Sequence, residues 1–333
     1  MSLSADQITI AITVYNRRQY LKQAIASALN QTVPVRVIVV EDCGPDLQLR
    51  QFVHREFGDR VEYLRNPYRR GLFDNWNAAM EHCRTPWLSI LHDDDYLAPC
   101  FAEAMVALSH TAPDCGLFFG QTQIVNDQNE PIQEGMRPPM HTPWRRITLA
   151  DTVDNTPFPF AGQLFRLEHA QAVGGFNVAS QFAGDWEMWC QLITRFGAAQ
   201  TSATVAYCRT HGGLERGTSK IVLNGRLRPL VFIQQKRVLQ LMRQEGQAAR
   251  FERAEYLRRA PMSAAYLVRH GLGLSPRILR YNVGLLRRSP SPSLQHRLFK
   301  TATRCFGVGF VKLAARLYRL GSGVDKPSSG PRP

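Results

Sequence analysis

The chain has 333 residues, of which 44% are hydrophobic and 20% charged, a balance typical of a soluble globular protein with a sizeable core. Its first residues lack a basic segment followed by a long apolar one, and no run of about 18 apolar residues occurs, so we expect neither a signal peptide nor a transmembrane helix. The seven cysteines are scattered without a CxxC pair, which argues against a disulfide framework or a zinc site and favours a cytoplasmic protein.

The net charge of +14 is unevenly distributed along the chain. Residues 1–221 carry 19 Lys and Arg against 23 Asp and Glu, whereas residues 222–333 carry 22 against 4. This asymmetry predicts two regions with different purposes and a boundary near residue 221. We expect residues 222–320 to be helical, with breaks at Pro and Gly, and residues 321–333 to be a disordered tail.

The first hundred residues alternate between short apolar runs, typical of strands, and segments with helical spacing. This alternation predicts an α/β fold with a mostly parallel, doubly wound sheet. Residues 111–180 are interpreted as mixed and loop-rich. In chain order, we expect strands at 8–14, 35–40, 61–64, 87–91, 116–123 and 124–125, and helices at 19–29, 47–57, 72–83, 101–109 and 183–196.

Polar residues follow each of the first four expected strands. In open α/β sheets, ligands bind at the carboxyl ends of the strands, so a single site is expected there. No Gly-x-Gly-x-x-Gly follows the first strand and no Walker A motif occurs, which excludes a standard dinucleotide-binding fold and a P-loop. The strand-end segments are Tyr15-Asn16-Arg17, Glu41-Asp42, Arg65-Asn66 and Asp93-Asp94-Asp95.

The Asp triplet 93–95 follows the apolar run at 87–91 directly. Carboxylates are hard oxygen ligands that suit Mg²⁺ or Mn²⁺ better than zinc, and such ions keep positions open for substrate phosphates. The alternative is a solvated, Asp-rich turn. The polar residues at the other strand ends favour the metal site.

Several segments together resemble the family 2 glycosyltransferases of the GT-A fold. Each segment is weak alone, but their order and spacing over residues 7–220 are specific. The resemblance implies transfer of a sugar from a nucleotide-diphosphate donor to a hydroxyl group, with inversion at the anomeric carbon. It also implies a nucleotide-binding half at about 1–110 and an acceptor-binding half at about 111–221. The segments are ITVYNRRQYLKQAIASALNQT, VRVIVVED, NPYRRGLFDNWNAAM, WLSILHDDDYLAP, GGFNVASQFAGDWEMWCQL and YCRTHGG.

On the donor side, the resemblance implies that Asp42 contacts the nucleotide base or ribose and that Thr13 and Tyr15 line the same pocket. Arg70 and Asn75 are candidates for contacts to the nucleotide or the donor sugar, because a guanidinium suits phosphate. A solvated loop residue is the alternative for Arg69 or Arg70.

The Asp triplet matches the DxD-type motif of this family. The resemblance implies that Asp95 and Asp93 hold Mn²⁺ or Mg²⁺, with Asp95 the direct ligand, and that Asp94 faces the donor sugar or ribose. His211 matches a family position that can approach the metal or the diphosphate. A surface or packing histidine is the alternative.

Asp185, in GDWEMW, matches the aspartate that serves as general base in this family, and Glu187 is the alternative base. An acceptor hydroxyl is a poor nucleophile and needs such a base. A position at a helix start would keep the Asp185 carboxylate ionised, although an ordinary N-cap is the other interpretation. Trp186 and Trp189 could shape the acceptor pocket, and core packing is the favoured interpretation for Trp189.

The sequence departs from the family pattern after the second strand. Glu41-Asp42-Cys43-Gly44 replaces the commoner Asp-Asp-Gly-Ser, so the nucleotide pocket is expected to differ in detail.

The basic region contains an amphipathic segment at 295–320. Read as one helix, it gathers six apolar residues from Phe299 to Leu320 in a narrow arc and its Lys and Arg residues in another. Such a helix can lie on an anionic membrane surface, at the inner face of the cytoplasmic membrane, or pack its apolar stripe on the catalytic domain. Both interpretations remain open.

The leading hypothesis is an inverting, metal-dependent glycosyltransferase of surface polysaccharide biosynthesis. The donor is expected to be a UDP- or dTDP-sugar, and the acceptor a glycan or a lipid-linked glycan. The alternatives are a nucleotidyltransferase-like enzyme, which would carry a Gly-rich, Lys-containing loop after the first strand, and a non-catalytic membrane- or nucleic-acid-binding protein. No nucleic acid is expected as a partner, because few aromatic residues lie among the Arg residues of the basic region.

Overall fold

The computed structural model describes residues 3–132, 140–152, 159–180, 184–210, 240–241, 283 and 294–322. The chain divides into two compact units, Met1–Gly213 with Gln234–Val238, and Leu214–Ile233 with Leu239–Pro333. His211 and most of the predicted helical region 222–320 lie outside the described residues. The domain boundaries proposed from the sequence therefore stay predictions.

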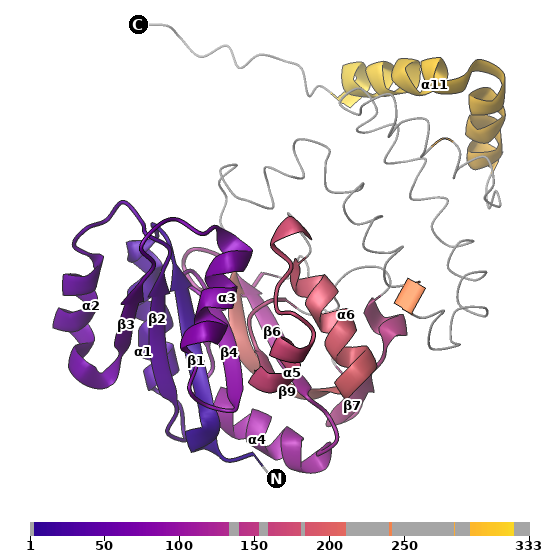
Figure 1. Ribbon diagram of the computed structural model, residues 1–333. Coiled ribbons are helices and arrows are strands. Elements are labelled where there is room, and N and C mark those ends of the chain that lie inside the picture. The colour runs from indigo at the N-terminus through magenta and orange to yellow at the C-terminus, as the bar shows by residue number, and fades with distance from the viewer. Residues whose placement is uncertain are drawn as a thin grey trace, which may run out of the picture. The chain divides into compact units, whose positions relative to one another are not determined.

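The first unit is built on one mixed sheet (Figure 1). Its parallel half has the order β3-β2-β1-β4, and the sheet continues as β8-β6-β9-β5, with β7 beside β9. We call this second part the mixed half, because β8 is antiparallel to both of its neighbours and β6 is parallel to β9. The strands are β1 Ile8–Val14, β2 Arg36–Glu41, β3 Glu62–Arg65, β4 Trp87–His92, β5 Tyr96–Leu97, β6 Leu117–Val125, β7 Trp144–Ile147, β8 Gln163–Arg166 and β9 Ala198–Arg209.

Helices cover both faces of this sheet, as the α/β prediction requires. Every residue of β1 is buried, which is typical of a parallel strand covered on two sides. Its alternate apolar residues, from Ile8 to Val14, share one core cluster with residues of α1, α2 and α4. Figure 1 shows α3, α5 and α6 in front of the sheet. The helices are α1 Arg18–Leu29, α2 Leu49–Phe57, α3 Leu72–His82, α4 Phe101–Thr111, α5 Leu167–Ala172 and α6 Gly184–Phe196, with short 3₁₀ turns at η1 Ala5–Gln7, η2 Gly58–Arg60, η3 Leu149–Thr152 and η4 Val178–Ser180.

The elements expected in the first 110 residues are present, with ends that shift by one or two residues. The mixed half differs more. The two strands expected at 116–123 and 124–125 are one strand, β6, and the sequence analysis did not predict β5, β7, β8 or β9. These strands are short or rich in Ala, Ser and Thr, and they form by pairing with residues far away in the chain.

The described helix of the second unit, α11 Leu294–Ser322, corrects the reading of 295–320 as one straight amphipathic helix. Gly307 has a non-helical backbone (φ 60°) and divides α11 into two arms, so the apolar residues do not share one continuous stripe. Phe299 and Phe310 lie on different arms and their rings pack at a centroid distance of 5.3 Å. The helix also runs two residues into the predicted tail. No helix among the described residues has the length and apolar character needed to cross a membrane.

Candidate active site

The carboxyl ends of the four parallel strands lie side by side, so the polar residues that follow them meet at one edge. In the strand register, Val14 is opposite Glu41 and Glu41 is opposite Arg65. Thr13, which is buried, is opposite both Val40 and His92. The predicted donor-side residues 13, 15, 42 and 93–95 therefore belong to neighbouring strand ends.

Asp42 is held rigidly at this edge. Its carboxylate accepts the backbone N–H of Arg70 at 2.6 Å and of Gly71 at 2.9 Å, at the start of α3, and the side-chain amide of Asn66 at 3.3 Å. Asn66 also donates to Asn75 Oδ1 at 2.9 Å. Asp42, Asn66 and Asn75 are all buried. Asn75 thus supports Asp42 through Asn66, and its predicted contact with the donor stays a prediction.

The two neighbouring arginines point in different directions. The Arg70 guanidinium donates to Asp74 at 3.1 Å and to Glu81 at 2.8 and 2.9 Å, and these two carboxylates raise its pKa. The guanidinium of Arg69 lies instead over the Tyr15 ring, 4.3 Å from its centroid. The side chain of Arg69 is therefore the one beside a predicted pocket residue, whereas the side chain of Arg70 is bound within the protein.

The departure at Cys43 and Gly44 has a backbone consequence. Cys43 has a φ of 49°, in the left-handed region that glycine adopts without strain. A Cβ on Gly44 would lie 1.8 Å from the carbonyl oxygen of Tyr15, so glycine is required there. The commoner family pattern places glycine at the position of Cys43, where this conformation is easy.

The Asp triplet lies between β4 and β5, and all three carboxylates are buried. Arg17 donates to Asp93 at 3.4 Å and to Asp94, and the amide of Arg209 donates to Asp95 at 2.9 Å. Burial, together with the charge of Asp94, raises the pKa of Asp93 to about 7 and also raises the pKa of Asp95. A nearby positive charge stabilises the ionised form of such carboxylates.

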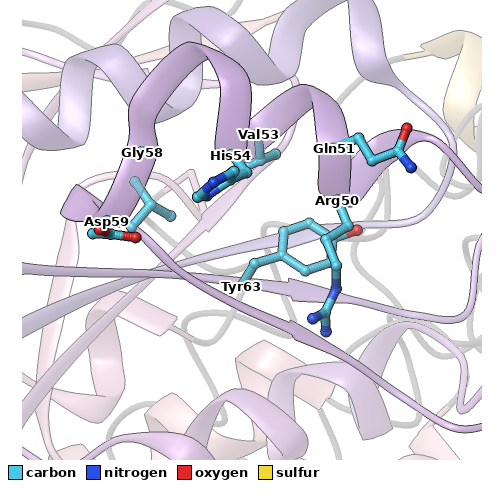
Figure 2. A pocket seen from close by; sticks show the side chains of 8 residues that line it. Arg50, Gln51, Val53, His54, Gly58, Asp59 and Tyr63 are labelled. Atoms are coloured by element: carbon cyan, nitrogen blue, oxygen red, sulfur yellow. The ribbon is translucent and has the colours of Figure 1, made fainter.

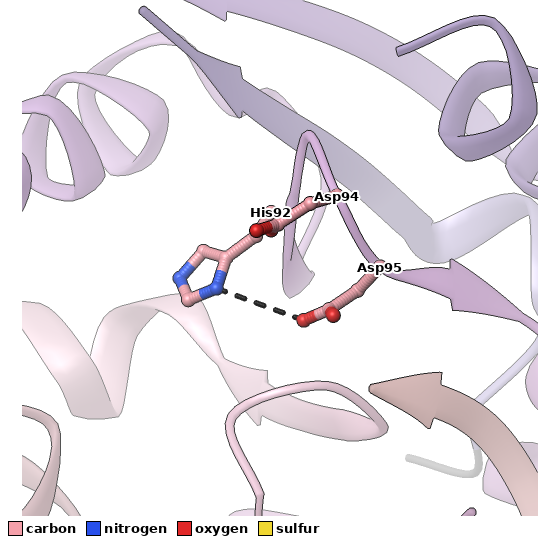
Figure 3. A group of neighbouring side chains, drawn as sticks. All are labelled: His92, Asp94 and Asp95. Carbon is pink, nitrogen blue, oxygen red and sulfur yellow. Dashed lines mark ion pairs between the residues drawn. The ribbon is translucent and has the colours of Figure 1, made fainter. Parts of the chain in front are cut away.

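Three potential ligand atoms come within 4.8 Å of one another on His92, Asp94 and Asp95 (Figure 3). His92 Nδ1 lies 3.7 Å from Asp95 Oδ2, and the imidazole stacks on Phe160 at a centroid distance of 4.5 Å. Carboxylate oxygens with one imidazole suit Mn²⁺ or Mg²⁺, so the residues present fit the expected ion. Of this group, Asp95 was predicted as a ligand from the sequence and His92 was not named; Asp93, the second predicted ligand, is not a member of the group.

Asp185 is the second residue of α6, as predicted, and its carboxylate accepts its own amide and that of Trp186. Burial outweighs these two hydrogen bonds and raises the pKa of Asp185 to about 6. From its place at a helix start, the Asp185 carboxylate was expected to stay ionised. It remains largely ionised at pH 7, but it lies within reach of protonation.

The start of α6 is packed against α3. A Cβ on Gly184 would lie 2.9 Å from the ring of Phe73, so glycine permits this close approach. The residues that lead into α3 therefore bind Asp42, and α3 itself packs against the segment that carries Asp185.

The other acidic and aromatic residues of α6 have structural partners. Glu187, the alternative base, accepts the side-chain amide of Asn177 at 3.1 and 3.2 Å and the hydroxyl of Ser180. Trp186 and Trp189 are each 1% exposed. Core packing is therefore confirmed for Trp189, and Trp186 is buried as well.

Arg17 was expected among the strand-end residues of the site but without a specific role, and Arg209 was given no role. Arg209 is buried at the end of β9, where its guanidinium donates to Gln23 at 2.7 Å and to Asn129 at 2.6 Å and lies 4.5 Å from the centroid of the Tyr20 ring. The backbone amide of Arg209 donates to Asp95, so the end of β9 lies beside the Asp triplet, two positions before His211 in the sequence. An Arg in a segment not recognised as a strand gave no signal for this role.

A surface hollow of about 400 Å³ lies elsewhere, along α2 and the edge strand β3 (Figure 2). None of the predicted site residues lines this hollow. Its lining residues are Arg50, Gln51, Val53, His54, Gly58, Asp59, Val61 and Tyr63.

The comparisons with known proteins agree with this geometry. Residues 9–173 match the model of Glycosyl transferase family 2, and the chain belongs to this family of enzymes. The parallel-dominant sheet with its helices matches the GT-A, Rossmann-like α/β fold.

Several relatives and solved structures are similar to the chain. An uncharacterized glycosyltransferase of Haemophilus influenzae is 22% identical over 61% of this chain and 68% of its own length. A chondroitin synthase of Escherichia coli is 26% identical over 56% of this chain, but over 26% of its own length. The chain spans little more than a third of several other curated relatives. Residues 1–349 of S. aureus TarS, solved in complex with UDP-GlcNAc, superpose with a TM-score of 0.58 at 15% identity, covering 94% of this chain and 92% of that one.

Proposed function

We propose that this enzyme transfers a sugar from a nucleoside diphosphate-sugar, linked to UDP or dTDP, to a hydroxyl group of a glycan or a lipid-linked glycan, with inversion at the anomeric carbon. The observation that carries the proposal is the shared strand-end edge, where Asp42 and the buried Asp triplet come together. This edge is where open α/β sheets bind ligands. The family match favours glycosyl transfer over the nucleotidyl-transfer alternative.

On the donor side, Asp42 accepts hydrogen bonds from the nucleotide base or ribose, and Thr13 and Tyr15 line the same pocket. Arg70 and Asn75 keep their proposed proximity to the donor, but their side-chain contacts support a role in holding Asp42 and α3 in place.

The metal site joins the donor to the Asp triplet. Asp95 would hold Mn²⁺ or Mg²⁺ together with Asp94 and His92, and the proposed ligands Asp93 and His211 extend this set. When bound, the ion stabilises the negative charge that develops on the departing diphosphate.

On the acceptor side, the Asp185 carboxylate takes the proton from the acceptor hydroxyl. The oxygen attacks the anomeric carbon from the face opposite the diphosphate, the C–O bond to the diphosphate breaks, and the nucleoside diphosphate leaves with that electron pair. A carboxylate whose pKa is about 6 is well matched to this work near neutral pH. Glu187 is less suited, because Asn177 and Ser180 already bind its carboxylate.

The relatives support a role in polysaccharide synthesis. One relative is named a chondroitin synthase and another a hyaluronan synthase, and the S. aureus TarS structure contains UDP-GlcNAc. These names support a nucleotide-sugar donor and an acceptor that is itself a glycan. We extend the proposal to surface polysaccharides on this basis.

The second arm of α11 supports attachment to the inner face of the cytoplasmic membrane. Leu313 and Leu317 are 53% and 61% exposed, and the basic residues Lys312 and Arg316 are exposed beside them. Exposed leucines flanked by cations are the pattern of helices that lie on anionic lipid surfaces. We expect the wild type to float with vesicles that contain anionic lipid and not with neutral vesicles. The L313S/L317S variant should not float with the anionic vesicles. Equal flotation of the wild type and the variant would remove this arm from the proposal.

The test of donor binding is a thermal-shift panel of the purified protein with UDP, dTDP, GDP, CDP and CMP, each with and without Mn²⁺. A ligand that binds the native state adds about 2.7 kcal/mol of stability at a hundredfold excess over its Kd. We expect UDP or dTDP to raise Tm strongly, and to do so with metal. A Tm that no nucleotide changes, with or without metal, would contradict the proposed donor site.

A further inference from the structure

Arg17 reaches over the Asp triplet from the start of α1. It is the residue immediately before this helix, and its guanidinium binds Asp94 and lies 3.4 Å from Asp93 Oδ1. The Arg17 side chain is 39% exposed, whereas the side chains of Asp93 and Asp94 are 9% and 10% exposed. A partly exposed cation thus covers two buried carboxylates.

The position of Arg17 differs from that of the other arginine near the triplet. The guanidinium of Arg209 is buried, is bound to Gln23 and Asn129, and contacts the triplet through the main-chain oxygen of Asp94. Arg209 therefore belongs to the fixed framework. Arg17 has one side toward solvent, so its guanidinium can leave the carboxylates without disturbing a buried network.

We propose that Arg17 is a displaceable counter-ion, which competes with the divalent cation for the Asp triplet and moves to the diphosphate of the donor when metal and donor bind together. This inference rests on the proposed function. Asp94 is a member of the group that would hold the ion, so metal and guanidinium would have to share one carboxylate. Two cations at one carboxylate repel each other, and one of them must leave.

The diphosphate provides the guanidinium with a new partner. Arginine binds phosphate through two parallel N–H donors, and the leaving group gathers charge in the region that metal and guanidinium share. When metal binds without nucleotide, Arg17 then loses its ion pairs with Asp93 and Asp94 and gains no new partner. When metal and nucleotide bind together, Arg17 gains an ion pair with the diphosphate. By linkage, nucleotide raises the affinity for metal and metal raises the affinity for nucleotide by the same factor.

The experiment measures Mn²⁺ binding by electron paramagnetic resonance, with and without saturating UDP, for the wild type, R17Q and R17K. All three proteins are compared in the same buffer of about pH 8, so that they share one set of titration conditions. R17Q should bind Mn²⁺ alone about fivefold more tightly, because its competitor is gone. Its gain in affinity on adding UDP should fall by about tenfold. R17K keeps a competing cation and should bind Mn²⁺ alone as the wild type does.

The matched control is R18Q, which removes the same charge from the next residue. Arg18 is 40% exposed and pairs with Asp46 at 3.4 Å, away from the triplet, so both affinities should stay within about twofold of wild type. Weaker or unchanged Mn²⁺ binding by folded R17Q would overturn the proposal, as would an undiminished effect of UDP. A wild type that binds neither UDP nor dTDP would instead refute the proposed function, which separates the two failures.

Discussion

The parallel and the mixed halves of the sheet hold their key carboxylates differently. In the parallel half, Asp42 accepts two backbone amides and a side-chain amide, which fix it as a hydrogen-bond acceptor. On α6, which packs against the mixed half, burial dominates at Asp185 and raises its pKa to about 6. A fixed acceptor suits recognition of a nucleotide, whereas a carboxylate near its pKa suits proton transfer. In the proposed function, nucleotide recognition by Asp42 and proton transfer by Asp185 therefore belong to different halves of the sheet.

The largest expected effect is on Asp185. D185N removes the proposed base while keeping the shape of the side chain, so the transfer rate should fall by about 10²–10⁴-fold with nucleotide binding retained. Single-turnover kinetics and a nucleotide titration check both parts. E187Q is the matched control and should lose less than about tenfold, because Glu187 binds Asn177 and Ser180. A fully active D185N beside an inactive E187Q would reverse the assignment.

A substitution at Asp42 tests the fixed hydrogen-bond acceptor of the parallel half. In D42N, an amide replaces one oxygen that accepts a backbone N–H, so a buried donor loses its partner at a cost of about 1–3 kcal/mol. Urea unfolding should show this loss, and the affinity for UDP should fall as well. Unchanged stability together with unchanged UDP affinity would mean that Asp42 is not the fixed acceptor described here.

The pH dependence of the transfer rate reports on Asp185 and not on Asp42. A base must be deprotonated to work, so kcat should fall about tenfold per pH unit below about 6, as Asp185 becomes protonated. Saturating metal and donor keep the Asp triplet in its bound form, so that this limb reports the base. A profile that stays flat down to pH 4.5, roughly the range of an unperturbed carboxyl group, would argue against burial as the tuning factor.

The smallest effect concerns Cys43. C43G relieves a left-handed backbone but makes the unfolded chain more flexible, and the two terms leave a net gain of about 0.5 kcal/mol. C43A removes the thiol without relieving φ and should show no such gain. Equal stabilities of C43G and C43A would show that the backbone at this position is not strained.

The parallel half could be predicted from sequence because its information is local. Three of the four strands in residues 8–92 contain a short apolar run, polar residues follow all four, and the register of the strands brings those polar residues together. The mixed half depends on long-range pairing. Strand β9 contains Ala, Ser and Thr with little alternation, and it forms because β6, β7 and β5 pair with it.

The same distinction applies to individual site residues. Asp42, Asp95 and Asp185 were proposed from motif and position, and the structure brings the first two to one edge of the sheet. His92 was missed, because its stacking on Phe160 joins β4 to a loop 68 positions further along the chain. Arg17 was expected at the strand-end edge without a named partner, and Arg209 was not named as a site residue, because their partners lie 77 and 186 residues away. A single sequence indicates which residues have side chains suited to catalysis or binding, but not which other residues the fold places beside them.

Helix α3 sets a limit on how this enzyme can be recombined with its relatives. Its start binds Asp42, Phe73 packs on Gly184, and Asn77 exchanges two hydrogen bonds of 2.9 Å with the backbone of Phe176. A chimaera of two family members with a crossover near residue 110, between the proposed donor-binding and acceptor-binding halves, would separate α3 from matching partners. Donor and acceptor specificities can therefore be exchanged independently only if residues 73, 77, 176 and 184 are all taken from the same parent protein.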